Sequence, residues 1–229
     1  MRKKIMLRLF SVFVLCSSTS LASAQNFNYT LSVEQGTYTP ITNGTVISPS
    51  ASDWMGWNTK VAIGFPVSIM GKTFDSLRVS SAGYLVFDDA TNLGFAYSGL
   101  PIKPTQDSLS QFQSSVRILQ TSNTLNIAFE KIGFYAESEN LYLSLMISIH
   151  SNGKIEIAFG DNNFTTEAWE RNSKILGLIN MSDLQNDQMA LVTAGSSSSP
   201  SLQSVQTGAI IPSLVGWPTS GTHFFIQPN

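Results

Sequence analysis

Cysteine is nearly absent from this sequence of 229 residues, and charged side chains are scarce. The single cysteine is Cys16, close to the amino terminus, so no disulfide can form within the chain. Charged residues make up 12% of the sequence and histidine occurs only twice, which leaves few side chains for acid–base or metal chemistry. The protein must therefore be stabilised by a packed apolar core.

The first 24 residues have the pattern of a secretory signal peptide. Met1-Arg2-Lys3-Lys4 is basic, the run Ile5–Leu15 is largely apolar, and small residues follow up to Ala22-Ser23-Ala24. The apolar run is too short for a helix that spans a bilayer, and the A-x-A ending indicates a cleavage site. We expect cleavage after Ala24, which leaves residues 25–229 as one mature domain beginning at Gln25.

The leader also contains Cys16, but Leu15 before it is bulky where a lipoprotein signal has a small residue, so we expect no lipid anchor. Four of the 13 basic residues and none of the 15 acidic ones lie in the leader, so the mature chain carries 9 − 15 = −6. A mildly acidic chain offers no electrostatic footprint for nucleic acid or an anionic membrane. We expect a secreted or periplasmic/extracellular protein that does not insert into a membrane after cleavage.

The stretch from Phe74 to Phe87 predicts two short strands folded back on each other. Apolar residues alternate in both arms, and pairing Val79 with Leu85 and Leu77 with Phe87 places all four on one face. This register leaves a three-residue loop, Ser81–Gly83, whose glycine suits the positive φ that such loops require. A two-residue loop would mix the two faces.

A second hairpin repeats this pattern around Ser151-Asn152-Gly153. The same register argument predicts the pairs Ile149–Ile155, Ile147–Ile157 and Leu145–Phe159. A two-residue turn at Asn152-Gly153 would instead place Glu156 opposite Ile149, and the Glu156 carboxylate would then be buried on the core face, which is unfavourable.

About ten short alternating segments, regular turn signals and no amphipathic helix predict an all-β fold: an antiparallel β-sandwich, jelly-roll-like. Pro66 predicts an edge or bulged strand, and a switch of alternation predicts a β-bulge near Glu130-Lys131. Residues 88–113 read as a long connection with at most one short element, and residues 196–201 as a flexible Ser/Pro loop.

Four stretches of the chain resemble a β-sandwich module of secreted and surface proteins of Bacteroidetes. They are residues 63–67 (IGFPV), 71–87 (GKTFDSLRVSSAGYLVF), 153–160 (GKIEIAFG) and 221–228 (GTHFFIQP). Ala82 stands where that module usually has asparagine. Relatives of the module often carry fibronectin-type domains and a type IX secretion sorting tail, which this sequence lacks. The resemblance implies a fold and an extracellular setting, but no agreed activity and no catalytic residues.

No residue pattern predicts a cofactor or a metal. His150 and His223 have no further ligand type at i+2 or i+4, so we expect both to be solvated surface histidines. Asp88, Asp89 and Asn92, and likewise 161–163, offer oxygens, but the ordered spacing of a calcium loop is missing, and solvated turns are expected.

Catalytic residues are also not predicted. Glu130 and Glu156 both lie on expected strands and could neighbour each other as the two carboxylates of a glycosidase, although the face of Glu156 reads as solvated. No Gly-x-Ser-x-Gly elbow or phosphate-binding glycine loop occurs. Four tryptophans are expected to cap the open ends of the core or, alternatively, to stack on sugars; they are Trp54, Trp57, Trp169 and Trp217.

Three functional hypotheses remain open at this point. The first is a secreted, non-enzymatic binding or adhesion module whose partner is an unknown protein or glycan. The second is a secreted glycan-active hydrolase on a jelly-roll scaffold, and the third is a structural subunit of a surface assembly.

The leader gives the first testable prediction. When the full chain is expressed in a secreting host, the exported protein is expected to begin at Gln25, because cleavage follows Ala22-Ser23-Ala24. Intact mass and amino-terminal sequencing measure this directly. Substituting Ala24→Arg should block processing. An exported protein that retains residue 1 would contradict the signal-peptide assignment.

Overall fold

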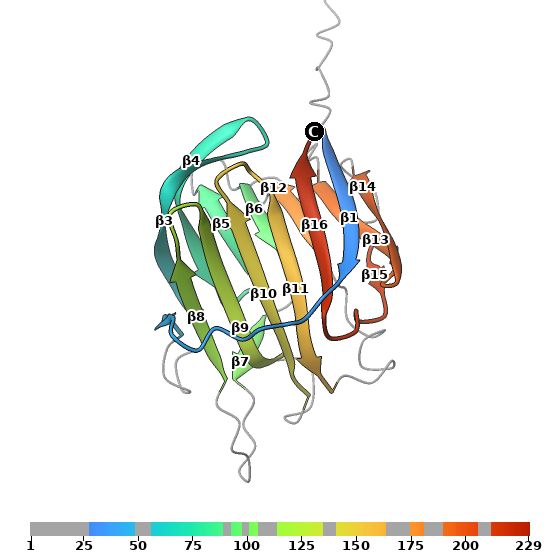
Figure 1. The fold of residues 1–229 in the computed structure, drawn as a ribbon, viewed down its shortest axis with the longest axis horizontal. Helices are drawn as coiled ribbons and strands as arrows, with labels where there is room; N and C mark the ends of the chain where they lie inside the picture. Colours follow the sequence, from blue (N-terminus) through green and yellow to red (C-terminus); the bar gives the residue numbers. More distant parts are fainter. Residues whose placement is uncertain are drawn as a thin grey trace, which may run out of the picture.

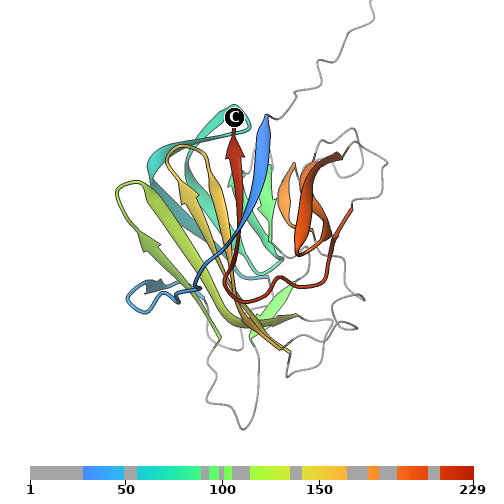
Figure 2. The same cartoon turned by 45° about the vertical axis from the view of Figure 1, so that its right-hand side comes forward.

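The computed structural model describes residues 28–48, 56–88, 93–97, 101–104, 114–134, 141–163, 175–180, 190–205 and 212–229. These residues form sixteen strands in two sheets that lie face to face (Figures 1 and 2). They form no helix, and so none long and apolar enough to cross a membrane. The expected antiparallel β-sandwich is confirmed.

Sheet A faces the viewer in Figure 1. In spatial order its strands are β1 (Tyr29–Gln35), β16 (Thr222–Pro228), β11 (Ile155–Asn162), β10 (Leu143–His150), β9 (Thr124–Phe134), β8 (Ser115–Gln120) and β2 (Thr45–Val46), while β7 (Ile102–Pro104) also pairs with β9.

Sheet B lies behind sheet A. Its order is β14 (Ser199–Val205), β13 (Ala190–Ser196), β12 (Gly177–Asn180), β6 (Leu93–Ala96), β5 (Tyr84–Asp88), β4 (Lys72–Ser80) and β3 (Asn58–Ile69). The short strand β15 (Leu214–Val215) runs parallel to β13. All other pairs in both sheets are antiparallel.

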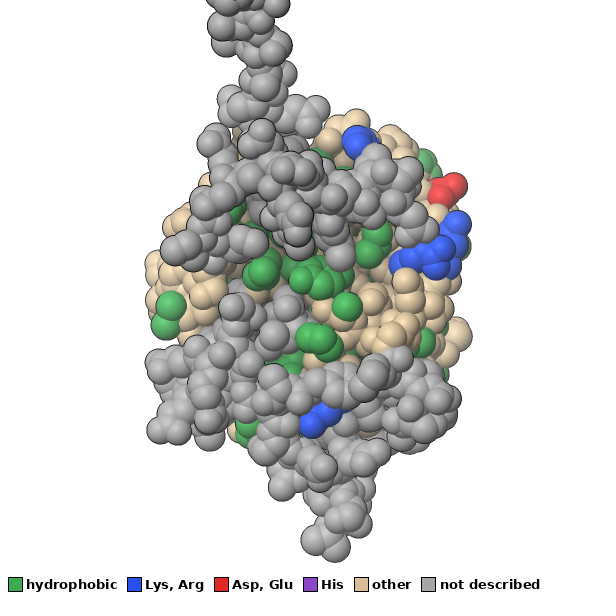
Figure 3. Space-filling model, turned by 180° about the vertical axis from the view of Figure 1, so that it is seen from behind, with side chains coloured by type: hydrophobic (Ala, Val, Ile, Leu, Met, Phe, Trp, Pro, Cys, Tyr) green, Lys and Arg blue, Asp and Glu red, His purple; other side chains and the backbone are tan. Residues whose placement is uncertain are grey.

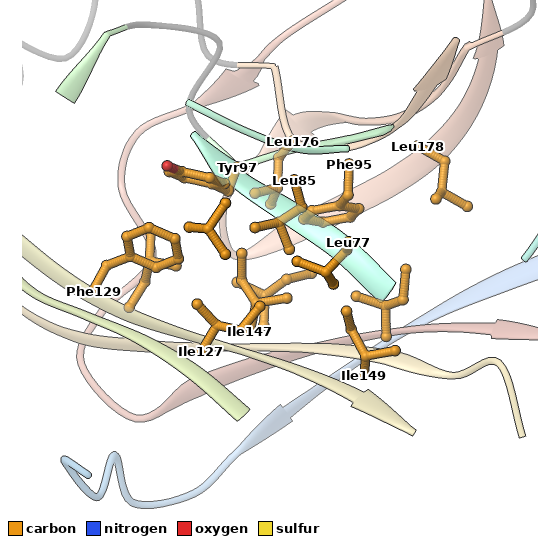
Figure 4. Packing of buried hydrophobic residues seen from close by; sticks show 14 of the residues in the cluster. Leu77, Leu85, Phe95, Tyr97, Ile127, Phe129, Ile147, Ile149, Leu176 and Leu178 are labelled. Carbon is orange, nitrogen blue, oxygen red and sulfur yellow. The ribbon is translucent and has the colours of Figure 1, made fainter. Parts of the chain in front are cut away.

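The core forms where the inner faces of the two sheets meet. Side chains alternate between the faces of a strand, so the odd-numbered apolar residues of β9, β10 and β11 all point inward. In Figure 4, Ile127 and Ile147 of sheet A point toward Leu77 and Leu85 of sheet B, and Phe129 lies beside Tyr97; all six are at most 1% exposed. The sequence alternation therefore decides which face of each strand is buried.

Both predicted hairpin registers are confirmed. In β4–β5, Val79 pairs with Leu85 and Ser80 with Tyr84, and Gly83 has φ +88°. The three predicted pairs of β10–β11 all occur, and Gly153 closes that turn with φ +82°. In each hairpin the glycine adopts a conformation that other residues rarely reach, so the alternation and the glycine fix the register together.

The predicted bulges are also present. Between the pairs Ala62–Ser76 and Val67–Phe74, β3 advances five residues while β4 advances two, and β3 is the edge strand of sheet B. From Phe129 to Ile132, β9 advances three residues while its partner β10 advances only two, and Lys131 has φ +50°. Pro66 and Lys131 thus mark local departures from regular pairing.

Two expectations about connections were wrong. Residues 88–113 contain two strands, β6 and β7, rather than at most one short element, and β6 is a central strand of sheet B. Residues 196–201 are not a flexible loop, because Ser196 pairs with Ser199 and the β13–β14 hairpin turns through Ser197 and Ser198. The expected number of about ten strands was too low because five of the sixteen described strands have four residues or fewer.

The connection from β1 to β2 crosses the outer face of sheet A (Figure 1). We call residues 36–44 the strap. At one end the Gly36 N–H donates to the Gly221 carbonyl at 2.7 Å. At the other end Gly44 lies so close to β8 that a Cβ there would be 2.5 Å from the Ile118 carbonyl oxygen. The strap therefore needs glycine where it approaches the sheet.

A second, smaller apolar cluster lies on the outer face of sheet B. It contains Ala96, Ile179, Val192 and Val205, each at most 6% exposed. Figure 3 shows this face, with hydrophobic side chains near its middle, the main group of Lys and Arg side chains at one edge and a few others above and below the centre. Sheet B is therefore apolar on both faces in its centre, which is unusual for an antiparallel sheet with one solvated face.

Gly153 gives a prediction about stability. Gly153→Ala would place a Cβ 2.5 Å from the Ser68 carbonyl oxygen at a φ of +82°, so we expect a loss of at least about 2 kcal/mol in the free energy of unfolding. Gly71→Ala is the matched control, because it has a similar φ of +77° but no atom within 4 Å of the new Cβ; it should cost only about 1 kcal/mol. Urea titration compares the two, and equal losses would contradict the close approach of Ser68.

Candidate functional site

Three ionisable side chains meet on the outer face of sheet A, one from each of the adjacent strands β10, β11 and β16. Glu156 lies between two histidines: its Oε1 is 2.9 Å from Nδ1 of His223, and its Oε2 is 3.4 Å from Nε2 of His150. The three side chains are 16–23% exposed. Glu156 pairs with Ser148 of β10 and with Phe225 of β16. His150 and His223 are each two residues from these partners, so both imidazoles lie on the same face as the Glu156 carboxylate and beside it.

The His223 contact orients that ring. Because a carboxylate oxygen accepts, Nδ1 of His223 is the donor to Oε1 of Glu156 at 2.9 Å, and Nε2 is the other ring nitrogen. That Nε2 is buried, and among the described residues it has no hydrogen-bond partner. It lies under the strap, since a Cβ on Gly36 would be 3.0 Å away. His223 is therefore held between Glu156 and the strap.

The environment of His150 is less favourable to a positive charge. Burial, followed by the nearby Lys154 ammonium, lowers the pKa of His150, and Glu156 opposes the shift in part. Its 3.4 Å contact with Glu156 is long for a hydrogen bond, and we regard it as electrostatic. Lys154 itself lies over the ring of Phe225, with Nζ 4.9 Å from the centroid.

These observations correct the expectation of solvated histidines. Both rings are mostly buried and paired with Glu156, and Ser148 on the same face is only 3% exposed. The pairing was missed because Glu156 and His223 are 67 positions apart in the sequence. Across the residues that the structure describes, no three His, Cys, Asp or Glu side chains converge as metal ligands.

The other strand carboxylate of interest, Glu130, lies far from Glu156. Glu130 is four residues beyond Asn126, the residue level with Glu156 two strands away. With about 3.3 Å per residue and about 4.8 Å per strand, the Cα atoms of the two residues are roughly 16 Å apart. A glycosidase pair needs about 5–10 Å, so the geometry gives the pair no catalytic role.

Glu130 instead fastens the strap. The Tyr38 hydroxyl donates to its Oε1 at 2.6 Å. Burial, together with the Glu130 charge, raises the pKa of Tyr38 far above its ordinary value, so the hydroxyl keeps its proton. The Tyr38 ring covers Gly160, where a Cβ would lie 2.7 Å from the ring. Nothing in the sequence around Tyr38 indicated this role.

A hollow of about 450 Å³ opens where the β3 bulge interrupts the ladder with β4. Its lining residues come from β3, β4 and β5: Pro66, Thr73, Phe74, Asp75, Ser76 and Phe87. Phe74 and Phe87 lie against each other with ring centroids 5.5 Å apart, and both are nearly buried. Only the parts of these side chains that stay exposed, 8% of Phe74 and 4% of Phe87, form the apolar floor of the hollow.

The rim of the hollow is polar. Asp75 is exposed and Ser76 is half-buried, so a carboxylate and a hydroxyl lie beside the apolar floor, with Thr73 close by. Ligand sites typically combine a concave apolar surface of about 300–1,000 Å³ with a few polar groups. The hollow has this combination, and it depends on the bulge that Pro66 and Gly64 impose on β3.

The remaining residues singled out in the sequence have structural roles or lie outside the described parts. Trp57 and Trp217 pack against the core, as expected for caps, and Trp217 meets Phe159 edge-on at 5.1 Å. Asp161 accepts a hydrogen bond from Ser220 at 3.1 Å. The predictions for four further places concern residues or side chains that the structure does not describe: Trp54, Trp169, the Asp88 side chain and the pair Asp89 and Asn92.

A comparison with protein-family models matches residues 28–225 to NIDO-related domains. The chain belongs to the NIDO-related family. This membership indicates an extracellular-type module, and the match spans both sheets. The comparisons with curated proteins and with solved structures find no match. The resemblance expected from the sequence agrees with the NIDO-related match as far as an extracellular-type β-sandwich module is concerned. The Bacteroidetes origin of the chain stays a prediction.

The His150 environment gives a prediction about pH. The folded protein binds the His150 proton less readily than the unfolded chain does, so stability should fall as the pH drops through the ordinary histidine range toward the lower folded pKa. An NMR titration should place the His150 midpoint below that of a histidine in a short peptide. Lys154→Met should raise the midpoint and Glu156→Gln should lower it further. A midpoint at or above the peptide value would contradict the stated balance of causes.

Proposed function

We propose that this NIDO-related chain is an extracellular, non-catalytic binding module that holds a carbohydrate unit in the hollow between β3, β4 and β5. The observation that supports the proposal is the hollow itself, with its aromatic floor and its rim of carboxylate and hydroxyl groups. The leader of residues 1–24 and the family membership support an extracellular location.

The chemistry of the hollow suits a sugar better than a flat apolar ligand. A pyranose ring has an apolar C–H face, which fits against Phe74 and Phe87, and hydroxyl groups at its edge. An ionised carboxylate accepts hydrogen bonds from such hydroxyls and makes stronger bonds than neutral groups do. Asp75 is exposed at the rim and supplies this acceptor, while Ser76 both donates and accepts.

A hydrolase is the alternative in which a bound glycan would be cleaved. The two strand glutamates considered for it have Cα atoms roughly 16 Å apart by strand spacing, and each carboxylate is bound elsewhere, Glu130 by Tyr38 and Glu156 by His223. Binding without cleavage is therefore the function that the described geometry supports best. The test below distinguishes binding of a glycan from binding of a surface protein in the same hollow.

Asp75 gives the test of the proposal. Wild-type protein is applied to a glycan array, and the best glycan is then titrated by calorimetry. Asp75→Asn should weaken binding by about 10- to 100-fold, because a hydrogen bond to a charged group contributes about 1.5–3 kcal/mol. Asp75 is exposed, so the fold should be unchanged.

Asp161→Asn is the matched control, since Asp161 is an exposed acid on β11 in the other sheet. It should leave glycan affinity unchanged. Absence of any glycan binding at millimolar concentration would overturn the carbohydrate proposal. Capture of a surface protein that Asp75→Asn abolishes would keep the site but replace the ligand. Equal effects of both substitutions would locate the binding elsewhere.

A further inference from the structure

Among the residues that the structure describes, strand β1 is hydrogen-bonded to one neighbouring strand only, β16. All seven of its residues pair with β16, in a register from Tyr29–Pro228 to Gln35–Thr222. Two hydrogen bonds that flank the strand show which of its residues bond to β16. They run from the Asn229 N–H to the Asn28 carbonyl and from the Gly36 N–H to the Gly221 carbonyl. Even-numbered residues of β1 therefore bond to β16, since bonded and non-bonded pairs alternate in an antiparallel ladder.

The odd-numbered residues direct their backbone groups the other way. The N–H and C=O groups of Tyr29, Leu31, Val33 and Gln35 point to the open edge of sheet A. From Ser32 to Gln35 the strand is exposed, and Val33 is one of only three large hydrophobic side chains that are exposed among the described residues, at 36%. This edge is regular, and no described strand pairs with it, although β14 of sheet B lies close to β1.

The other sheet edges carry features that hinder pairing with another chain. Strand β2 has two residues, and β3 contains Pro66 and a break in register. The Thr193 N–H donates to Leu176, so odd-numbered residues of β13 bond away from β14 and even-numbered ones bond to it. Pro200 pairs with the odd-numbered Gly195, so its nitrogen, which carries no hydrogen, lies at the open edge of β14. Short strands, bulges and edge prolines are the usual protections against edge-to-edge association. Strand β1 has none of them.

The sequence of β1 is complementary to itself in one antiparallel register. When two copies meet about a two-fold axis at Ser32, Leu31 lies opposite Val33 and Tyr29 lies opposite Gln35. Each of these directly opposed pairs joins two open-edge residues, so each can exchange two backbone hydrogen bonds. On the outer face Glu34, the strand's one charge, lies opposite Thr30, so like charges do not meet.

We propose that two copies of this chain associate through their β1 strands, antiparallel and centred on Ser32, so that sheet A continues from one copy into the other. The contact is isologous, as in most symmetric dimers. It satisfies the open N–H and C=O groups of β1 and covers the exposed Val33 with the partner's Leu31. The dimer is independent of the hollow on sheet B.

Single cysteines test the register. In a Cys16→Ser background, the only cysteine of the chain is removed. Ser32→Cys places a thiol opposite its own copy in a non-bonded pair, where Cα atoms are about 4.5 Å apart and a disulfide forms readily. Thr30→Cys is the matched control, because Thr30 is equally exposed on the same strand but faces Glu34 of the other copy.

Under mild oxidation we expect Ser32→Cys to give a covalent dimer on a non-reducing gel at a rate at least ten times that of Thr30→Cys. Equal rates would overturn the proposed register, and no dimer from either variant would overturn the association.

Sedimentation equilibrium of the wild type tests the association without cysteines. Val33→Pro removes one open-edge N–H while sparing the β16 ladder, because Val33 occupies a non-bonded pair with Phe224; it should shift the mass from dimer to monomer. Val33→Lys is a second variant that keeps the backbone. Val215→Lys, at a valine that is 60% exposed on β15, is the control and should remain dimeric. A wild type that is monomeric up to millimolar concentration would overturn the proposal.

Discussion

The structure depends on the contact between the inner faces of two sheets. With a single cysteine there is no disulfide, and the described residues contain no helix to share the burial of apolar surface. The inner faces meet through large side chains such as Phe129 and Tyr97, whose ring centroids are 4.3 Å apart. Burial of one such side chain contributes about 1.5–3 kcal/mol, so the loss of a few would exhaust the stability of a typical domain.

Much of this arrangement could be predicted from the sequence, because strand alternation and turn glycines are local signals. The β10–β11 register followed from apolar residues at odd positions and from Gly153 alone. Strands β6 and β7 could not be found in the same way. Strand β6 is buried on both faces, so Leu93-Gly94-Phe95-Ala96 shows no alternation, and β7 has only three residues.

The candidate sites were less predictable because they join residues from distant parts of the chain. Glu156 meets His223 only after β11 and β16 become neighbours, and the strap places Tyr38 beside Glu130 across 92 positions. The bulge at Pro66 was foreseen, but a bulge in a sequence does not show that a hollow lies beside it. Each site arises where regular pairing is interrupted or where a connection crosses a sheet. Such irregular places are where β-proteins usually position functional side chains.

The pairing of β1 with β16 also determines when the fold can be completed. Asn28 and Asn229, at the two ends of this pair, are 201 positions apart and joined by a hydrogen bond. Contacts between such distant residues slow folding, because the loop must close before they stabilise it. Strand β1 precedes β16 in the chain, so it is synthesised earlier and cannot form this pair until β16 follows. Until β16 is in place, the edge of β11 that it covers is unpaired. Removing β16 would therefore leave β1 without its strand partner and uncover the edge of β11, so the cohesion of sheet A depends on this one strand.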